Sequence, residues 1–139
     1  MTIFKFDIEP VAQARPRAVR QGGGVRVYDP PKTAQFKREL GMLARALTRA
    51  KKYVIPTGGI SVNIQVVRTV PQSWSNKKRS EAIKGLIQPV TKPDLSNYIK
   101  SIEDALNGIL WHDDNATVQL ISSKQYGRVG RVIVEINEV

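Results

Sequence analysis

The carboxylates of this chain are concentrated in one stretch. The net charge of the protein is +10, yet five of its twelve Asp and Glu residues lie between Lys92 and Asp114. These five are Asp94, Glu103, Asp104, Asp113 and Asp114. Like charges brought together cost energy unless a cation lies among them. Carboxylate oxygens are hard ligands that suit Mg²⁺ or Mn²⁺. A bound divalent ion, which can activate water, is the simplest reason for the cluster.

An amphipathic helix joins the two ends of this stretch. Its apolar residues recur at i, i+4, i+7 and i+11: Leu95, Ile99, Ile102 and Leu106. Gly108 is a stop signal for the helix. Each acidic end also has an ordinary interpretation, since Asp94 or Ser96 could cap the helix and Asp113-Asp114 could form a turn. Both ends together favour the metal hypothesis, which requires Asp94 and Asp114 to converge.

Composition limits the class of protein. A length of 139 residues fits one domain, spanning 1–139, with enough chain for a hydrophobic core. The absence of cysteine excludes disulfides and thiolate metal sites, and a single histidine excludes a histidine-rich zinc site. The first ten residues lack the apolar core of a signal peptide, and no stretch is long enough to cross a membrane. We therefore expect a soluble cytoplasmic protein without a membrane partner.

The apolar pattern predicts a mixed α/β (α+β) fold. Strands are indicated where apolar and polar residues alternate, at 4–8, 60–66, 118–120 and 132–136. A helix is expected from about 31 to 51, with Asp29 or Thr33 as its cap. A shorter one is expected within 75–85, capped by Ser75 or Asn76. The order β–hairpin–α–β–α–β–β, with that short helical segment before the central helix, fits a small mixed sheet with helices on one face. The last two strands are expected to pair as a hairpin.

Basic residues gather outside the acidic stretch, and the sequence pI is near 10.2. Two extended arms around Gly22–Gly24 predict a hairpin whose arginines we expect to contact DNA: Arg15, Arg17, Arg20 and Arg26. The alternative is a solvated edge hairpin, because charge on an edge discourages aggregation. For a second cluster, phosphate contact and plain solvation are equally supported: Lys77, Lys78 and Arg79.

Two motifs resemble one known family. The stretch KPDLSNYIKSIEDALNGILWHDD resembles the signature of the RusA family of Holliday junction resolvases: K-P-D-x-D-N, a Lys three residues on, D-A-L-x-G and a final D-D before a strand. Upstream, ARPRAVRQGGGVRVYDPPKT resembles that family's R-P-R, basic hairpin and P-x-K-T segment, which adds Lys32 to the candidates for DNA contact. The two motifs occur in the expected order and extend from about residue 10 to 120.

The resemblance implies a homodimeric endonuclease that depends on Mg²⁺, with Mn²⁺ as a possible substitute. Such enzymes of bacteria or phages cut paired strands of four-way DNA junctions in recombination and repair, with acidic sites close to the dimer interface. By position, Asp94 and Asp114 match the essential carboxylates and Lys100 the assisting lysine. Asp113 and Ser96 complete the implied set of metal ligands. Asp104 matches the Asp of D-A-L, for which we expect a structural role.

Ser96 departs from the family pattern, which has a second Asp there. A serine hydroxyl can ligate Mg²⁺ but contributes no charge. The change is compatible with a weaker nuclease, a rearranged site, an introduced inactivating substitution, or a protein that binds junctions without cutting them. A basic RNA-binding domain with a structural acidic turn is a third hypothesis, which the motifs favour least.

Overall fold

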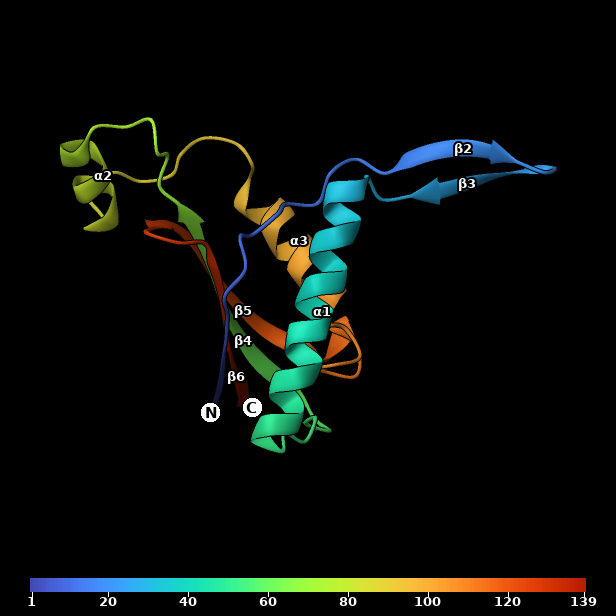
Figure 1. Ribbon diagram of the computed structural model, residues 1–139. Coiled ribbons are helices and arrows are strands. Elements are labelled where there is room, and N and C mark those ends of the chain that lie inside the picture. Colours follow the sequence, from blue (N-terminus) through green and yellow to red (C-terminus); the bar gives the residue numbers. More distant parts are fainter.

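A four-stranded mixed sheet carries the fold in the computed structural model, which describes residues 1–139 (Figure 1). Its strand order is β1-β6-β4-β5, and a separate hairpin is formed by β2 and β3. The strands are β1 (Thr2–Phe6), β2 (Arg17–Gln21), β3 (Gly24–Tyr28), β4 (Ile60–Thr69), β5 (Thr117–Gly127) and β6 (Arg131–Glu138). The helices are α1 (Pro31–Lys51), α2 (Asn76–Ile83), α3 (Leu95–Leu106) and the short 3-10 turn η1 (Asp114–Ala116). The predicted fold class and element order are confirmed.

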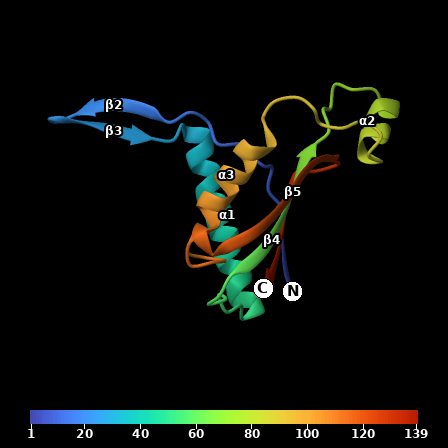
Figure 2. The same cartoon turned by 180° about the vertical axis from the view of Figure 1, so that it is seen from behind.

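Helices α1 and α3 cover one face of the sheet, as the sequence predicted, and α2 lies beyond its end (Figures 1 and 2). The alternation from Ile60 to Val66 explains this arrangement, because the even-numbered side chains of this part of β4 are buried in the core while its odd-numbered polar ones face outward. Leu40 of α1 and Ile102 and Leu106 of α3 are fully buried in the same core. The open face of α3 is left for other contacts.

The expected hairpin between the last two strands is wrong. Strand β4 lies between them: Val62 is paired with Leu120 of β5 in parallel and with Ile136 of β6 in antiparallel fashion. The short turn from β5 to β6 therefore crosses the end of β4, where the N–H of Val70 donates to the carbonyl of Gly127 at 3.0 Å. Sequence neighbours usually pair, but here β4, with Ile60, Val62, Ile64 and Val66 buried, lies between β5 and β6 in the interior of the sheet.

Two of the helix ends predicted from local sequence are confirmed, and the predicted cap of α1 is not. Ser75 caps α2, with its Oγ accepting the N–H of Lys78 at 3.2 Å, as expected. Helix α3 ends before Gly108, whose φ of +80° lies in the left-handed region that favours glycine. Helix α1 begins at Pro31, but neither Asp29 nor Thr33 caps it, because no side chain accepts a hydrogen bond there. The Asp29 carboxylate instead accepts hydrogen bonds from the side chains of Lys37, in the second turn of α1, and of Gln13.

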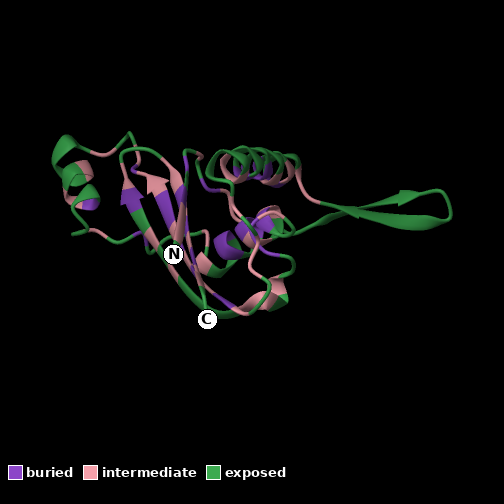
Figure 3. Ribbon diagram, turned by 90° about the horizontal axis from the view of Figure 1, so that it is seen from below, coloured by how far each residue is buried: buried purple, intermediate pink, exposed green.

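The β2–β3 hairpin projects from the body of the protein, and every residue in it is exposed (Figure 3). Figure 1 shows the hairpin and α2 at opposite ends of the molecule, with the start of α3 between them. The basic clusters that the sequence placed on these two elements are therefore separated in space. The beginning of the acidic stretch lies between them.

Candidate functional site

Asp94 stands at the start of α3 with a free carboxylate. Its backbone is extended, with φ −66° and ψ 146°, and its carbonyl accepts the N–H of Asn97 at 3.1 Å. The side chain, however, accepts no capping hydrogen bond, and it is exposed. The capping interpretation of this carboxylate is therefore not supported, and its oxygens remain available to a ligand.

The outward face of α3 carries three further polar groups. Ser96, Lys100 and Glu103 follow one another at i, i+4 and i+7, which places them on one side of the helix. The side chains of Ser96 and Lys100 are exposed and form no hydrogen bond or ion pair within the chain. An uncompensated ammonium and a free hydroxyl thus lie along the helix that begins at Asp94.

A second acidic group lies at the other end of α3. Asp114 is half-buried, and its Oδ1 accepts the indole N–H of Trp111 at 3.0 Å. Asp113, beside it, is exposed. Burial raises the pKa of Glu103, and the charges of Asp114 and Asp104 raise it further. Glu103 therefore shares the electrostatic environment of Asp114. Glu103 belongs to the acidic stretch but was not among the predicted site residues, although its position seven residues after Ser96 places it on the same face.

The two acidic ends do not meet within one chain. Helix α3 has 12 residues and is about 18 Å long, with Asp94 at its start and the η1 turn beyond its end (Figures 1 and 2). No group of three or more Asp, Glu or His side chains is placed to hold a metal ion. The oxygen donors are chemically suited to Mg²⁺, but one chain does not assemble them. Their convergence stays a prediction.

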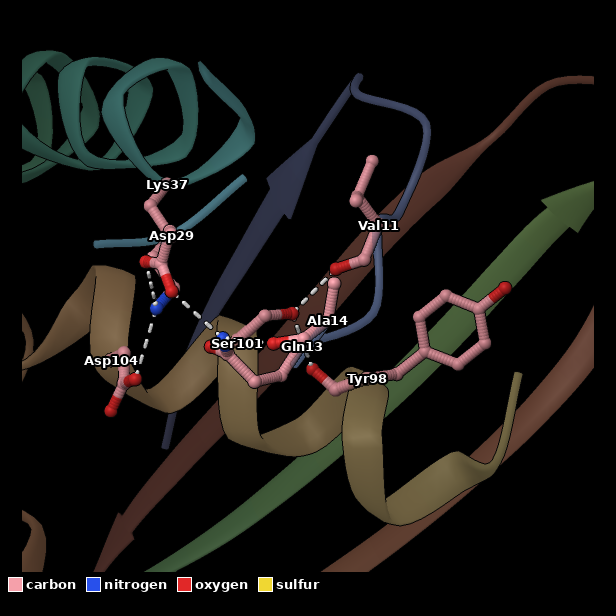
Figure 4. A network of polar contacts seen from close by, with 8 residues as sticks. All are labelled: Val11, Gln13, Ala14, Asp29, Lys37, Tyr98, Ser101 and Asp104. Atoms are coloured by element: carbon pink, nitrogen blue, oxygen red, sulfur yellow. Dashed lines mark hydrogen bonds and ion pairs between the residues drawn. The ribbon is translucent and has the colours of Figure 1, made fainter. Parts of the chain in front are cut away.

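A polar network fixes the base of the hairpin to α3 (Figure 4). On the way into β2, the carbonyl of Val11 accepts the Ser101 hydroxyl at 2.5 Å. After β3, Asp29 accepts hydrogen bonds from Lys37 Nζ at 2.8 Å and from Gln13 Nε2 at 2.9 Å. Lys37 also donates to Asp104 of α3 at 3.1 Å, which agrees with a structural role for Asp104. The hairpin is therefore positioned relative to the helix that carries Asp94.

Removing the bridging ammonium should loosen this connection, and we expect Lys37→Met to lower the free energy of unfolding by about 1 kcal/mol at pH 7. Burial lowers the pKa of Lys37, but hydrogen bonds from it to Asp29 and Asp104 outweigh burial and raise it above 10.5. The bond to Lys37, and then that to Gln13, lowers the pKa of Asp29 below 3.8.

The pH dependence follows from these directions. A carboxylate whose pKa is lowered on folding stabilises the protein above its unfolded value, and the contribution is lost as the pH falls through the folded value. The difference between wild type and Lys37→Met, measured by urea unfolding, should therefore shrink below about pH 3.8. Lys32→Met on the same helix is the control, since Lys32 is exposed and unpaired. Equal losses in both variants would contradict the bridging role.

The basic residues outside this network are almost all free of carboxylate partners. Only Lys37 and Arg131 form ion pairs, the second with Asp7 at 3.0 Å. The predicted DNA-binding residues are exposed except for half-buried Arg79: Arg15, Arg17, Arg20, Arg26, Lys32, Lys77, Lys78 and Arg79. The Lys78 ammonium lies 4.1 Å from the centre of the Trp74 ring. Trp74 in turn packs against Tyr126.

Comparison with known proteins finds a family match and a relative. The family model described as "Endodeoxyribonuclease RusA" matches residues 7–137. An uncharacterized protein of Bacillus subtilis (strain 168), YqaN, is 42% identical over 143 residues, covering 100% of this chain and 99% of that protein. No helix has the length and apolar character needed to span a bilayer. The match over nearly the whole chain shows that the protein belongs to the RusA endodeoxyribonuclease family.

Proposed function

We propose that the protein is a metal-dependent endonuclease that resolves Holliday junctions and related branched DNA, and that it acts as a homodimer. The observation that carries this proposal is the free carboxylate of Asp94 at the start of α3, beside Ser96 and Lys100 and between two basic elements. A nuclease needs its carboxylates exposed to the DNA and basic groups on either side of them.

The proposed dimer is supported by the separation of the two acidic ends along α3. Symmetric dimers place the same surface of each copy against the other. If α3 of each copy lies antiparallel to its counterpart, Asp94 and Ser96 of one copy approach Asp114 of the second. Two equivalent acidic sites then form, each with oxygen ligands from both chains. Antiparallel helices also bring opposite ends of their dipoles together.

The edge of the sheet beside α3 supports such an interface. Strand β5 is an edge strand of 11 residues, and its Val118 and Leu120 are 64% and 44% exposed. The register of Leu120 with Val62, a core residue, directs Leu120 to the side of the sheet that carries α3. A long edge strand with exposed apolar side chains near its start invites pairing with another chain. A second copy would cover it.

Each residue of the proposed site has a role that fits its chemistry. Asp94, Ser96 and Asp114, with Asp113 next to it, would supply oxygen ligands to Mg²⁺ or Mn²⁺. Bound there, the ion would supply an activated water for attack on a phosphodiester. Lys100, on the outward face of α3, stabilises the negative charge that develops on the phosphate. The hairpin arginines hold the DNA in place.

The register of the hairpin yields a sharper prediction about binding. Arg17 is paired with Tyr28 and Val19 with Arg26, so Arg17 and Arg26 lie on one face, while Arg20 is paired with Val25 on the other. If one face contacts DNA, the double change Arg17→Ala/Arg26→Ala should weaken junction binding about tenfold and reduce its salt slope by about 2. Titration at several salt concentrations measures both quantities.

Arg20→Ala serves as the comparison, because it removes a charge from the opposite face of the same hairpin. We expect it to change the salt slope by less than half as much as the double variant. If all three arginines contribute equally, the hairpin acts as a flexible cationic arm without a preferred face. Unchanged slopes in every variant would remove the hairpin from the binding surface.

The alternative is a junction-binding protein with weakened or absent cleavage, and Ser96 is the observation that favours it. Cleavage of a synthetic four-way junction and of a matched duplex, with and without Mg²⁺ or Mn²⁺, distinguishes the two. Metal-dependent nicks confined to the junction support the nuclease. Tight, junction-selective binding without cleavage at any metal concentration supports the alternative. Equal binding of junction and duplex contradicts both.

A further inference from the structure

A basic hollow lies between α2 and the turn that connects β5 to β6. Its volume is about 500 Å³, and it is lined by two apolar residues and by Gln72, Asn76, Arg79, Ser80, Lys84 and Arg128. Three of these residues are cationic and none is a carboxylate. The hollow is at the opposite end of the molecule from the hairpin, and only Arg79 of its cations was selected from the sequence.

The positive charge of this hollow is not compensated within the chain. None of its three cations forms an ion pair, although the protein does pair Lys37 and Arg131 with carboxylates elsewhere. Three like charges around one space repel each other, and an anion that enters removes this cost. The lining amide and hydroxyl groups offer further hydrogen bonds. The hollow is therefore suited to an anion with several oxygen atoms.

The guanidinium of Arg79 is held in place before any ligand binds. It donates to Gln72 Oε1 at 3.0 Å and to Asn76 Oδ1. Gln72 is itself fixed, because its Nε2 donates to the carbonyl of Val70 at 2.9 Å. Both acceptors of Arg79 are neutral amides, so no carboxylate offsets the positive charge of the guanidinium. A guanidinium oriented in this way loses less entropy when it binds a phosphate.

The turn that carries Arg128 is also fixed. Gly130 lies against Glu9, so closely that a Cβ there would lie 2.7 Å from the Cα of Glu9. Glu9 is anchored in turn, since its Oε1 accepts the N–H of Thr69 at 3.1 Å. Arg128 itself is exposed. The second side of the hollow is therefore a rigid support for an exposed guanidinium.

We infer that this hollow binds the phosphodiester backbone of a duplex arm that leaves the junction. The inference rests on the proposed function and extends it from the centre of the junction to an arm. Arginine and lysine on two separate, fixed elements suit the repeating phosphates of a duplex. Because the hollow lies apart from the start of α3, only an arm of sufficient length reaches it.

The test compares two double variants that remove the same charge. Lys84→Gln/Arg128→Gln neutralises two cations of the hollow and leaves the hydrogen bonds of Arg79 intact. Lys5→Gln/Arg49→Gln neutralises two exposed cations on β1 and in the last turn of α1. Binding is measured without divalent metal, so that no DNA is cut. The probes are four-way junctions whose arms range from about 6 to about 24 base pairs, or roughly 20 to 80 Å.

We expect the hollow variant to bind the long-armed junction about five- to tenfold more weakly than the control variant does. On the shortest arms the two variants should bind equally. Equal affinity of the two variants at every arm length would overturn the inference. So would a hollow variant that binds more weakly than the control variant by the same factor at every arm length. If wild type shows no affinity for junctions, the proposed function fails together with it. If wild type binds and the variants do not differ, only the hollow is excluded.

Discussion

Asp114→Asn should reduce junction cleavage at least about 100-fold while leaving junction binding intact. The carboxylate is expected to help hold the ion that activates water, and such an ion contributes several kcal/mol to the rate. An amide oxygen can still accept the indole N–H of Trp111, which the Asp114 Oδ1 now accepts at 3.0 Å. The fold around Trp111, which is 1% exposed, should therefore be kept.

Single-turnover cleavage and metal-free binding of the same junction measure these two effects. Glu39→Gln is the matched control, because it neutralises an exposed carboxylate on α1 that bonds only to Gln35. We expect that variant to cleave at the wild-type rate. If Asp114→Asn cleaves as fast as Glu39→Gln, Asp114 has no part in the reaction.

Ser96→Asp should lower the Mg²⁺ concentration needed for half-maximal cleavage by about tenfold. The change adds a charged oxygen ligand next to Asp94, and even changes to the residues that support metal ligands commonly shift affinity by about 10- to 100-fold. Ser96 is exposed and lies in the first turn of α3, where a carboxylate is favoured by the helix dipole. The variant should therefore fold normally.

Ser96→Asn separates the effect of charge from that of size. Asparagine offers an oxygen of similar reach without a negative charge, so we expect little change in the metal requirement. A gain with Asp alone identifies charge as the missing property of the site. Equal metal requirements for wild type and Ser96→Asp, in variants that bind junctions normally, would mean that position 96 does not contact the ion.

The parts of the fold that local sequence determines were predictable. The apolar stripe of α3, the cap at Ser75 and the glycine turn of the hairpin each depend on residues a few positions apart. The position of β4 between β5 and β6 depends on competition among distant strands. That pairing could not be read from β5 and β6 alone, which is why the expected hairpin was wrong.

In the candidate site, too, residues that are close in sequence could be predicted, and contacts between distant residues could not. Asp94, Ser96 and Lys100 could be selected because they share one helix. In the bridge from Asp29 through Lys37 to Asp104, Lys37 and Asp104 are 67 positions apart, and no local pattern indicates this contact. Glu103 could have been found from its helical spacing. The predicted helix already separated Asp94 from Asp114, but the sequence could not show whether the chain after the helix returns Asp114 to Asp94. In the structure, η1 lies beyond the far end of α3.

Subunit complementation tests most directly the claim that two chains complete each site. Asp94→Asn and Asp114→Asn are each expected to be inactive as homodimers. In a heterodimer of the two, one composite site receives an intact Asp94 from one chain and an intact Asp114 from the other, while the second site receives neither. Purified through two different affinity tags, the heterodimer should nick one strand of a junction at about half the wild-type rate per dimer. An inactive heterodimer that still binds the junction would show that each site is built within a single chain.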